Sequence, residues 1–188
     1  MPGEPPVLIV PGLGGSGPDH WQSLWQARLP NASRVEQADW DRPDRAGWIA
    51  RLDAAVAQAP RPPILVAHSL SCALVACWAA SYLRPIHAAL LVGPADIESD
   101  TRTPPETHTF RPLPLARLPF TTIVVASRDD PYVDFERATA MARAWCAELV
   151  DAGNAGHLNT ASGYGEWPVG ERLLSRLRRI NMLQSTAD

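Results

Sequence analysis

Short apolar runs alternate with segments of helical periodicity along nearly the whole chain. The run from Val7 to Val10 is mostly β-branched and ends at a Pro-Gly pair, which is typical of a strand covered on both faces. Between such runs, apolar residues recur every three or four positions, which predicts amphipathic helices. The predicted strands are residues 7–10, 33–37, 64–68, 88–92, 121–126 and 146–150, and the predicted helices are residues 21–29, 48–56, 70–82, 135–145 and 171–180.

This alternation predicts an α/β fold with a parallel sheet and right-handed crossovers. No internal repeat or linker interrupts it, so we expect a single domain over residues 1–188, with a core at about 7–180 and a polar tail at 181–188 that frays. One irregular stretch, residues 94–119, contains six prolines. We interpret it as a stiff surface crossover, and the alternative is a substrate lid.

The composition excludes several classes of function. All 17 basic residues among the 188 are arginine, so the chain has no lysine for a Schiff base, a Walker-type phosphate site or a Ser-Lys dyad. A net charge of −3 without a basic stripe argues against nucleic-acid partners. No segment approaches the roughly 20 apolar residues that a membrane span needs, and the acidic N-terminus is unlike a signal peptide. We therefore expect no membrane association and a cytoplasmic location.

The cysteines and three of the histidines carry no pattern of a metal site. His20, His87 and His108 lack metal-ligand spacing with cysteines or carboxylates. We expect no metal and no cofactor. Three cysteines stand among apolar or small residues and are predicted to be buried, reduced thiols: Cys72, Cys77 and Cys146.

Three chemically useful side chains follow three of the predicted strands. Ser69 follows the third strand, Asp130 the fifth and His157 the sixth. Since ligands of open α/β sheets bind at the carboxyl ends of the strands, these loops should meet. A serine hydroxyl needs a base with a pKa near neutrality, which imidazole supplies, and a carboxylate can orient that imidazole. The three residues therefore predict a catalytic triad.

Each of these residues also has a simpler interpretation. Ser69 is a suitable helix N-cap, Asp130 a suitable turn residue, and His157 an ordinary loop histidine. Asp129 is a rival for the carboxylate role. Each simple interpretation is reasonable alone, but it is improbable that all three hold for residues that stand in the order Ser, Asp, His at strand ends, which favours the catalytic hypothesis.

The sequence around Ser69 has the pattern of a nucleophile elbow. Residues 67–71 read Ala-His-Ser-Leu-Ser, which is G-x-S-x-G with both glycines replaced by the small residues Ala67 and Ser71. Small neighbours are needed because the elbow is a tight, strained turn. His68 is expected to pack beside the serine without taking part in catalysis.

The glycine-rich loop after the first strand admits two interpretations. Gly12, Gly14 and Gly17, with Glu36 further on, outline a dinucleotide fingerprint. However, Pro18 suggests that the helix begins at about residue 18, whereas a dinucleotide fold begins its helix inside the motif. We therefore favour a loop that supplies a backbone N–H. In a triad enzyme, the N–H groups of Leu13 and Leu70 would then form the oxyanion hole. Four residues at this edge of the sheet are candidates for substrate contact: Gly12, Gly14, His20 and Trp40.

Five segments together carry a resemblance to a known family. They are PGLGGS at 11–16, DHW at 19–21, VAHSL at 66–70, SRDDP at 127–131 and AGHLN at 155–159. Over about residues 7–180 the chain resembles the small, lidless α/β-hydrolases of the retinoblastoma-binding serine hydrolase family, in its bacterial branch.

The resemblance implies a three-layer α/β-hydrolase sandwich with a six-stranded parallel sheet, no large cap domain, and serine hydrolase chemistry. It implies that Ser69 is the nucleophile, that His157 is the base, and that the aspartate directly before proline, Asp130, is the acid. The chain departs from many relatives at Ser71, where they keep glycine. With this resemblance we expect the strand order 2-1-3-4-5-6.

We therefore expect a serine hydrolase that acts on a small-molecule acyl substrate, most readily a carboxylic ester, through an acyl-enzyme. Two alternatives come from other classes of protein. One is a non-catalytic interaction protein on a hydrolase scaffold, for which no run of charge marks a protein partner. The other is a dinucleotide-binding protein that uses residues 12–17.

Overall fold

Six parallel strands form the centre of the computed structural model, which describes residues 4–180. The strand order is β2-β1-β3-β4-β5-β6 with every neighbouring pair parallel, as expected. Four of the strands are buried along their whole length, which explains their continuous apolar sequences. The strands are β1 (Val7–Val10), β2 (Ala32–Arg34), β3 (Ile64–His68), β4 (Ala88–Val92), β5 (Thr122–Ala126) and β6 (Glu148–Asp151).

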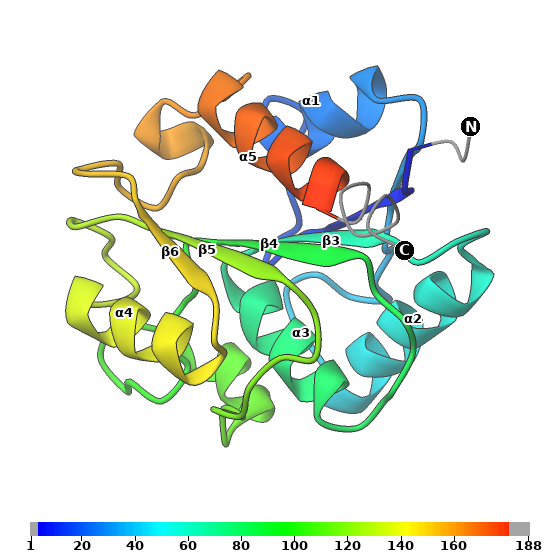
Figure 1. Ribbon diagram of the computed structural model, residues 1–188. Helices are drawn as coiled ribbons and strands as arrows, with labels where there is room; N and C mark the ends of the chain where they lie inside the picture. The colour runs from blue at the N-terminus through cyan, green and yellow to red at the C-terminus, as the bar shows by residue number, and fades with distance from the viewer. Residues whose placement is uncertain (1–3, 181–188) are drawn as a thin grey trace.

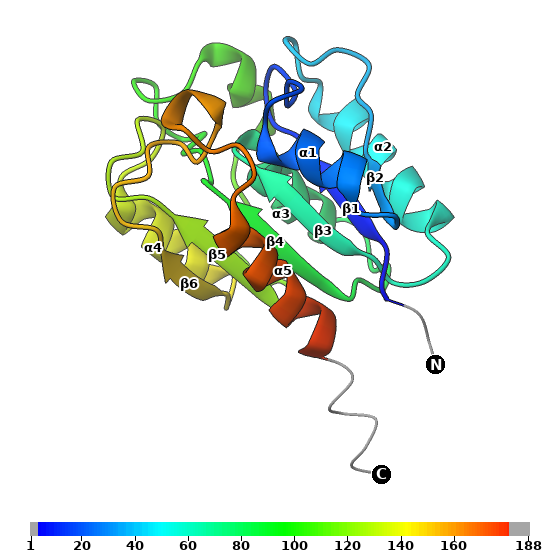
Figure 2. The same cartoon turned by 90° about the horizontal axis from the view of Figure 1, so that it is seen from above.

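Helices cover both faces of the sheet and complete a three-layer sandwich (Figures 1 and 2). Figure 1 shows α1 and α5 on one face and α2, α3 and α4 on the other. No large cap domain stands above the sheet within residues 4–180, so the fold class is the one expected. The helices are α1 (Trp21–Arg28), α2 (Arg45–Gln58), α3 (Leu70–Ala79), α4 (Phe135–Ala144) and α5 (Pro168–Arg179).

The alternation of side chains along the strands divides the core into two clusters. Val7 and Ile9 of β1 pack on the side of α1 and α5, and Leu8 and Val10 pack on the side of α2, α3 and α4. The helix α3 is buried at every position from Leu70 to Trp78. It therefore gives rigid support to the residue that precedes it, Ser69.

Two strands differ from their predicted bounds by more than one residue. β2 ends at Arg34 rather than at residue 37, because its partner β1 ends where Pro11 has no N–H to continue the ladder. β6 begins two residues late, because Cys146 has a positive φ of 57° and is not extended. Cys146 is also exposed, which corrects its predicted burial, since it leads into an edge strand. Cys72 and Cys77 are buried, as predicted.

Three helices also begin at other residues than predicted. One of them, α5, begins at Pro168 rather than at residue 171, because proline is favoured at the first helical position. α1 begins at Trp21, where its apolar periodicity begins, and not at about residue 18 as Pro18 suggests, so its N-terminus is even further from the glycine loop. This is unlike a dinucleotide site, in which the helix begins within the glycine motif. α2 begins at Arg45 because the carboxylate of Asp44 accepts from the Gly47 N–H (2.7 Å) and caps the helix early. The predicted tail at 181–188 lies outside the described residues.

The proline-rich stretch at 94–119 is a packed crossover between β4 and β5. It contains a short 3-10 helix at Pro105–Phe110. Phe110, Leu113 and Leu118 are buried in the core cluster under α3 and α4, and they anchor the stretch to the body of the fold. This agrees with the interpretation of the stretch as a crossover.

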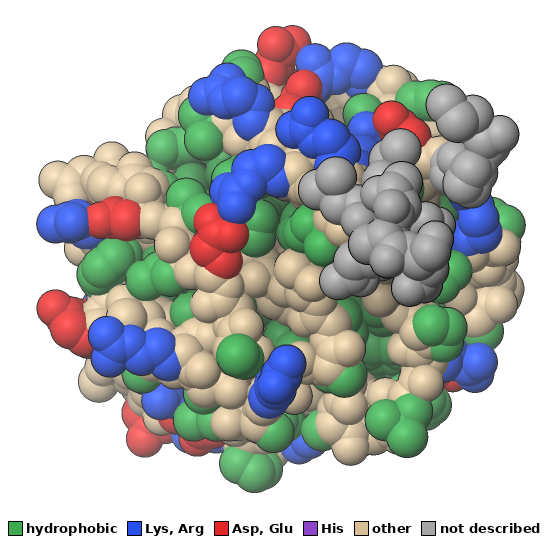
Figure 3. Space-filling model, viewed as in Figure 1, with side chains coloured by type: hydrophobic (Ala, Val, Ile, Leu, Met, Phe, Trp, Pro, Cys, Tyr) green, Lys and Arg blue, Asp and Glu red, His purple; other side chains and the backbone are tan. Residues whose placement is uncertain are grey.

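Charged side chains of both signs mix on the face formed by α1 and α5 (Figure 3). Arg28 pairs with Glu171, and Arg176 pairs with Glu148 at 2.7 Å. On this face, then, the positive charges of these arginines are balanced by acidic neighbours. None of the helices between residues 4 and 180 has both the length and the apolar character to cross a membrane.

Candidate active site

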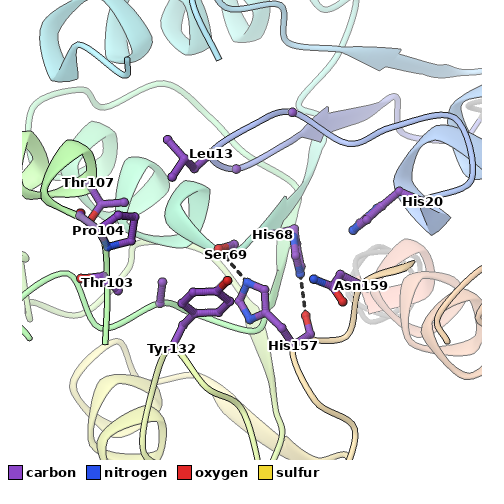
Figure 4. A pocket seen from close by; sticks show the side chains of 13 residues that line it. Leu13, His20, His68, Ser69, Thr103, Pro104, Thr107, Tyr132, His157 and Asn159 are labelled. Atoms are coloured by element: carbon purple, nitrogen blue, oxygen red, sulfur yellow. Dashed lines mark hydrogen bonds between the residues drawn. The ribbon is translucent and has the colours of Figure 1, made fainter. Parts of the chain in front are cut away.

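Ser69 lies at a sharp turn between β3 and α3. Its backbone has φ 58° and ψ −124°, a strained conformation for a residue with a side chain, and its N–H donates to the Val92 carbonyl (2.9 Å). Although Ser69 stands at the N-cap position of α3, its hydroxyl makes no capping bond. The hydroxyl is directed toward His157 instead (Figure 4).

A continuous hydrogen-bonded chain joins Ser69, His157 and Asp130. The Nδ1 atom of His157 lies 2.9 and 3.0 Å from the two carboxylate oxygens of Asp130, and its Nε2 atom lies 2.8 Å from Ser69 Oγ. Since a carboxylate only accepts, His157 Nδ1 donates and Nε2 is left to accept from the serine hydroxyl. The Asp130 carboxylate is fully buried and also accepts from the Tyr132 N–H (2.9 Å). The structure thus brings together the three residues that the sequence selects.

Asp129, the rival carboxylate, has other partners. Its Oδ1 accepts from Ser127 Oγ (2.7 Å) and from the Gly156 N–H (2.8 Å), and these hydrogen bonds lower the pKa of Asp129. Gly156 has a φ of 54°, and a Cβ there would lie 2.3 Å from Ser162 Oγ, which accepts from the His157 N–H (3.0 Å). Asp129 therefore holds the loop that carries the histidine.

A cavity of about 190 Å³ lies beside Ser69 (Figure 4). Of the sequence candidates, Gly12, Leu13, His20 and His157 line it together with the serine. Neither charge nor periodicity singles out the other lining residues, although Tyr132 and Asn159 each follow a triad candidate by two positions. The lining residues that sequence reasoning missed are Ala95, Thr103, Pro104, Thr107, Tyr132 and Asn159, together with Gly15 and His68, which it did not assign to the substrate.

Gly14 and Trp40 are not among the residues that line this cavity, and their contact with substrate stays a prediction. The Gly14 N–H donates to the Trp40 carbonyl (2.9 Å). The Trp40 ring packs against Gly15, where a Cβ would lie 3.3 Å from it, and edge-on against Trp48 with 5.7 Å between ring centroids. Trp40 therefore supports the glycine loop from behind.

The N–H groups of Leu13 and Leu70 are free beside the serine. Within residues 4–180, neither of them donates a hydrogen bond. Leu70 opens α3, where the first N–H groups lack helical acceptors. Gly12 brings the loop against the elbow, because a Cβ there would lie 2.8 Å from the His68 carbonyl oxygen and 3.0 Å from Ser69 Cβ. Any larger residue at this position would push Leu13 away from the serine.

Two neutral histidines lie next to His157. His68 Nε2 donates to the His157 carbonyl (2.9 Å), and the His68 ring lies 4.9 Å from the His20 ring and 4.7 Å from the His157 ring. His20 Nδ1 accepts from the Gln22 N–H (3.2 Å) at the start of α1. Burial is the main cause that lowers the pKa of His20 to about 4 and the pKa of His68 well below its usual value. Both side chains are therefore neutral at neutral pH.

Because the folded protein keeps His20 neutral, it should lose stability in mild acid. The pKa of His20 is 6.5 in the unfolded chain and about 4 in the folded chain. Between these two pH values the unfolded state binds more protons, so the free energy of unfolding falls as the pH falls. From about pH 7 to pH 5, His20 alone should remove roughly 2 kcal/mol. Urea unfolding of the wild type and of His20→Asn, which keeps a capping acceptor without titrating, measures this difference. Equal pH dependence in the two proteins would refute it.

A family model described as serine hydrolase matches residues 7–176, from β1 into α5. The chain belongs to the serine hydrolase family. All the residues of the hydrogen-bonded chain, and both free N–H groups beside it, lie inside the matched range. No curated protein sequence matches this serine hydrolase.

Solved structures agree on the fold of this serine hydrolase. It is similar to a YdeN-like hydrolase from Pectobacterium atrosepticum, with 30% identity, 94% of this chain and 92% of that chain covered, and a TM-score of 0.86. It shares the fold of the ydeN gene product of B. subtilis, with 21% identity, 92% of this chain and 98% of that chain covered, and a TM-score of 0.76. It also shares the fold of an esterase domain from Rhodothermus marinus, with 16% identity, 95% of this chain and 89% of that chain covered, and a TM-score of 0.69. With the family match, these likenesses make the protein an α/β-hydrolase enzyme.

Proposed function

We propose that this serine hydrolase cleaves small, uncharged carboxylic esters through Ser69, His157 and Asp130. The observation that carries the proposal is the hydrogen-bonded chain from the Asp130 carboxylate through His157 to Ser69 Oγ, beside the cavity. An imidazole oriented by a carboxylate is the base that a serine hydroxyl needs to act as a nucleophile at neutral pH. The narrower likeness to the retinoblastoma-binding serine hydrolases rests on the sequence motifs and stays a prediction.

In the first half of the proposed reaction, Ser69 Oγ attacks the ester carbonyl carbon while its proton passes to His157 Nε2. The carbonyl π electrons move to the oxygen, and this oxyanion accepts from the N–H groups of Leu13 and Leu70. Asp130 stabilises the imidazolium that forms. The bond between the acyl carbon and the alcohol oxygen then breaks, and His157 returns its proton to the leaving alkoxide.

In the second half, water attacks the acyl-enzyme and gives a proton to His157 Nε2. The second tetrahedral intermediate uses the same two N–H donors and collapses with loss of Ser69 Oγ, which recovers the proton from His157. The sum is ester plus water to carboxylic acid plus alcohol. The residues of the chain supply every proton transfer in this sequence.

The lining of the cavity supports a short, uncharged acyl group. Arg, Asp and Glu are absent from the described residues that line it. The hydroxyls of Thr103 and Thr107 already donate to backbone carbonyls, so they have no free proton to offer a polar acyl chain. A volume of about 190 Å³ is small for a ligand site, since such sites usually have roughly 300–1,000 Å³.

A series of p-nitrophenyl esters from acetate to decanoate tests this proposal. We expect kcat/KM to be highest for the two- to four-carbon acyl groups and to fall by about tenfold or more at eight carbons, because the longer chain does not fit. The Ser69→Ala variant gives the background rate, and an acetyl thioester run in parallel compares the two ester types. A rate that rises through eight carbons would reject the small-acyl assignment, and a wild-type rate equal to that of Ser69→Ala would reject the triad.

A further inference from the structure

The Ser71 hydroxyl takes no part in the proposed reaction, yet it makes one of the shortest side-chain hydrogen bonds near the site. Its Oγ donates to the Pro11 carbonyl at 2.6 Å, and the Ser71 side chain has no exposed surface. Ser71 stands in α3 two residues after the nucleophile, whereas Pro11 follows β1 and opens the glycine loop. The bond therefore ties the elbow to the loop that carries Leu13.

The Pro11 carbonyl depends on this bond. Pro11 is buried. Outside the regular helices and strands of residues 4–180, its carbonyl accepts a single hydrogen bond, which comes from the Ser71 hydroxyl. A buried carbonyl without a donor costs about 1–3 kcal/mol, so a glycine at position 71 would leave an unfavourable group at the root of the loop. The serine in place of the elbow glycine has a physical reason in this chain.

The position of the Leu13 N–H depends on the anchors at each side of it. On the far side, the Gly14 N–H donates to the Trp40 carbonyl (2.9 Å). On the near side, the Pro11 carbonyl accepts from Ser71, and Gly12 is in close contact with the elbow while its carbonyl accepts from the Gly15 N–H (3.1 Å) within the loop. Removal of the Ser71 hydroxyl removes the hydrogen bond that ties the near side of this loop to α3.

We propose that Ser71 is a positioning residue of the oxyanion hole, which sets the Leu13 N–H against the Leu70 N–H. This inference rests on the proposed function, because it needs an oxyanion between these two donors. Loss of a whole oxyanion-hole donor costs about 10²- to 10³-fold in kcat. A donor that is loosened but still present should cost less, about tenfold in kcat. Ser71 does not line the cavity, so substrate binding should change little.

The test compares Ser71→Ala and Ser71→Gly with a matched buried hydroxyl elsewhere. Thr122 is also buried, donates to the Phe120 carbonyl (3.1 Å) and begins β5 at the opposite end of the sheet, so Thr122→Val is the control. Both Ser71 variants should lose about tenfold in kcat with KM within about threefold, and a phenylboronic acid, whose tetrahedral adduct mimics the intermediate, should bind about tenfold more weakly. Thr122→Val should lose stability but keep kcat within about twofold.

Several outcomes would overturn the inference. Wild-type kcat in a folded Ser71→Gly would show that the small size of the residue matters and the hydroxyl does not. A lower Tm with unchanged kcat and boronate affinity in Ser71→Ala would show a purely structural role. If the Ser71→Ala and Ser71→Gly variants do not fold, the same measurements are made on Ser71→Cys, which is close to serine in size but is a weak hydrogen-bond donor. If wild-type hydrolysis equals that of Ser69→Ala, the proposed function itself is wrong and the inference falls with it.

Discussion

Replacement of Ser69 by alanine is expected to lower kcat for a short-chain ester by about 10⁴- to 10⁶-fold. The hydroxyl is the nucleophile in the proposed reaction, so its loss leaves only the contributions of the free N–H groups and of substrate binding. The elbow should still fold, because its bond to the Val92 carbonyl comes from the backbone of Ser69 and not from its side chain. Steady-state kinetics with p-nitrophenyl acetate measures the loss, and thermal unfolding checks the fold.

A similar loss is expected for His157→Ala. The double variant should be no slower than either single one, because the nucleophile and its base act as a unit. Ser81→Ala is the matched control, since it removes a hydroxyl that donates to the Cys77 carbonyl (3.3 Å) just past the far end of α3. It should keep kcat within about twofold. A folded Ser69→Ala that keeps more than about 1% of wild-type kcat would be incompatible with the triad.

Asp130→Asn is expected to fold normally and to lose about 10⁴-fold in kcat. The carboxylate of Asp130 accepts from His157 Nδ1 through both oxygens, which leaves Nε2 free to accept the serine proton. An asparagine amide can donate at this place, so Nδ1 can become the acceptor and the ring proton moves to Nε2. In that tautomer His157 cannot take a proton from Ser69. The measurement is kcat for the same ester, with circular dichroism to check the fold.

Asp129→Asn is the matched comparison for this carboxylate. Asp129 is the neighbouring residue and loses the same charge, but its partners Ser127 and Gly156 are donors that an amide oxygen can still accept from. We expect a loss of at most about tenfold in kcat, through a looser histidine loop. The reverse result, a slow Asp129→Asn and an active Asp130→Asn, would exchange the roles of the two residues.

The sheet and the hydrogen-bonded chain could be predicted because each depends on local sequence and one topological rule. Continuous apolar runs such as residues 64–68 need cover on both faces, and this fixed four of the strands almost to the residue. Parallel strands end at a common edge, so Ser69, Asp130 and His157 had to approach one another there. The choice between Asp129 and Asp130 was closer, because the partners that distinguish them, Gly156 and His157, are adjacent to each other and distant in sequence from both.

The wall of the cavity could not be predicted in the same way. Thr103, Pro104 and Thr107 come from an irregular stretch whose course is set by distant anchors such as Phe110 in the core. That the Trp40 ring packs against Gly15 could not be predicted either, because its distance along the chain from a strand end does not say which side of the loop the ring takes. The sequence marked Ser71 as a departure from glycine, but its partner lies sixty residues away in the chain, beyond any local pattern.

Labelling of the folded protein with a fluorophosphonate, read by intact mass and peptide mapping, tests whether Ser69 is an activated nucleophile. The reagent reacts with a serine hydroxyl that a neighbouring base has activated, and it needs no knowledge of the substrate. A single adduct on Ser69 is expected, absent from Ser69→Ala, strongly slowed in His157→Ala and lost after heat denaturation. A well-folded protein that takes up no label, or that carries its label on another residue, would contradict this role of Ser69.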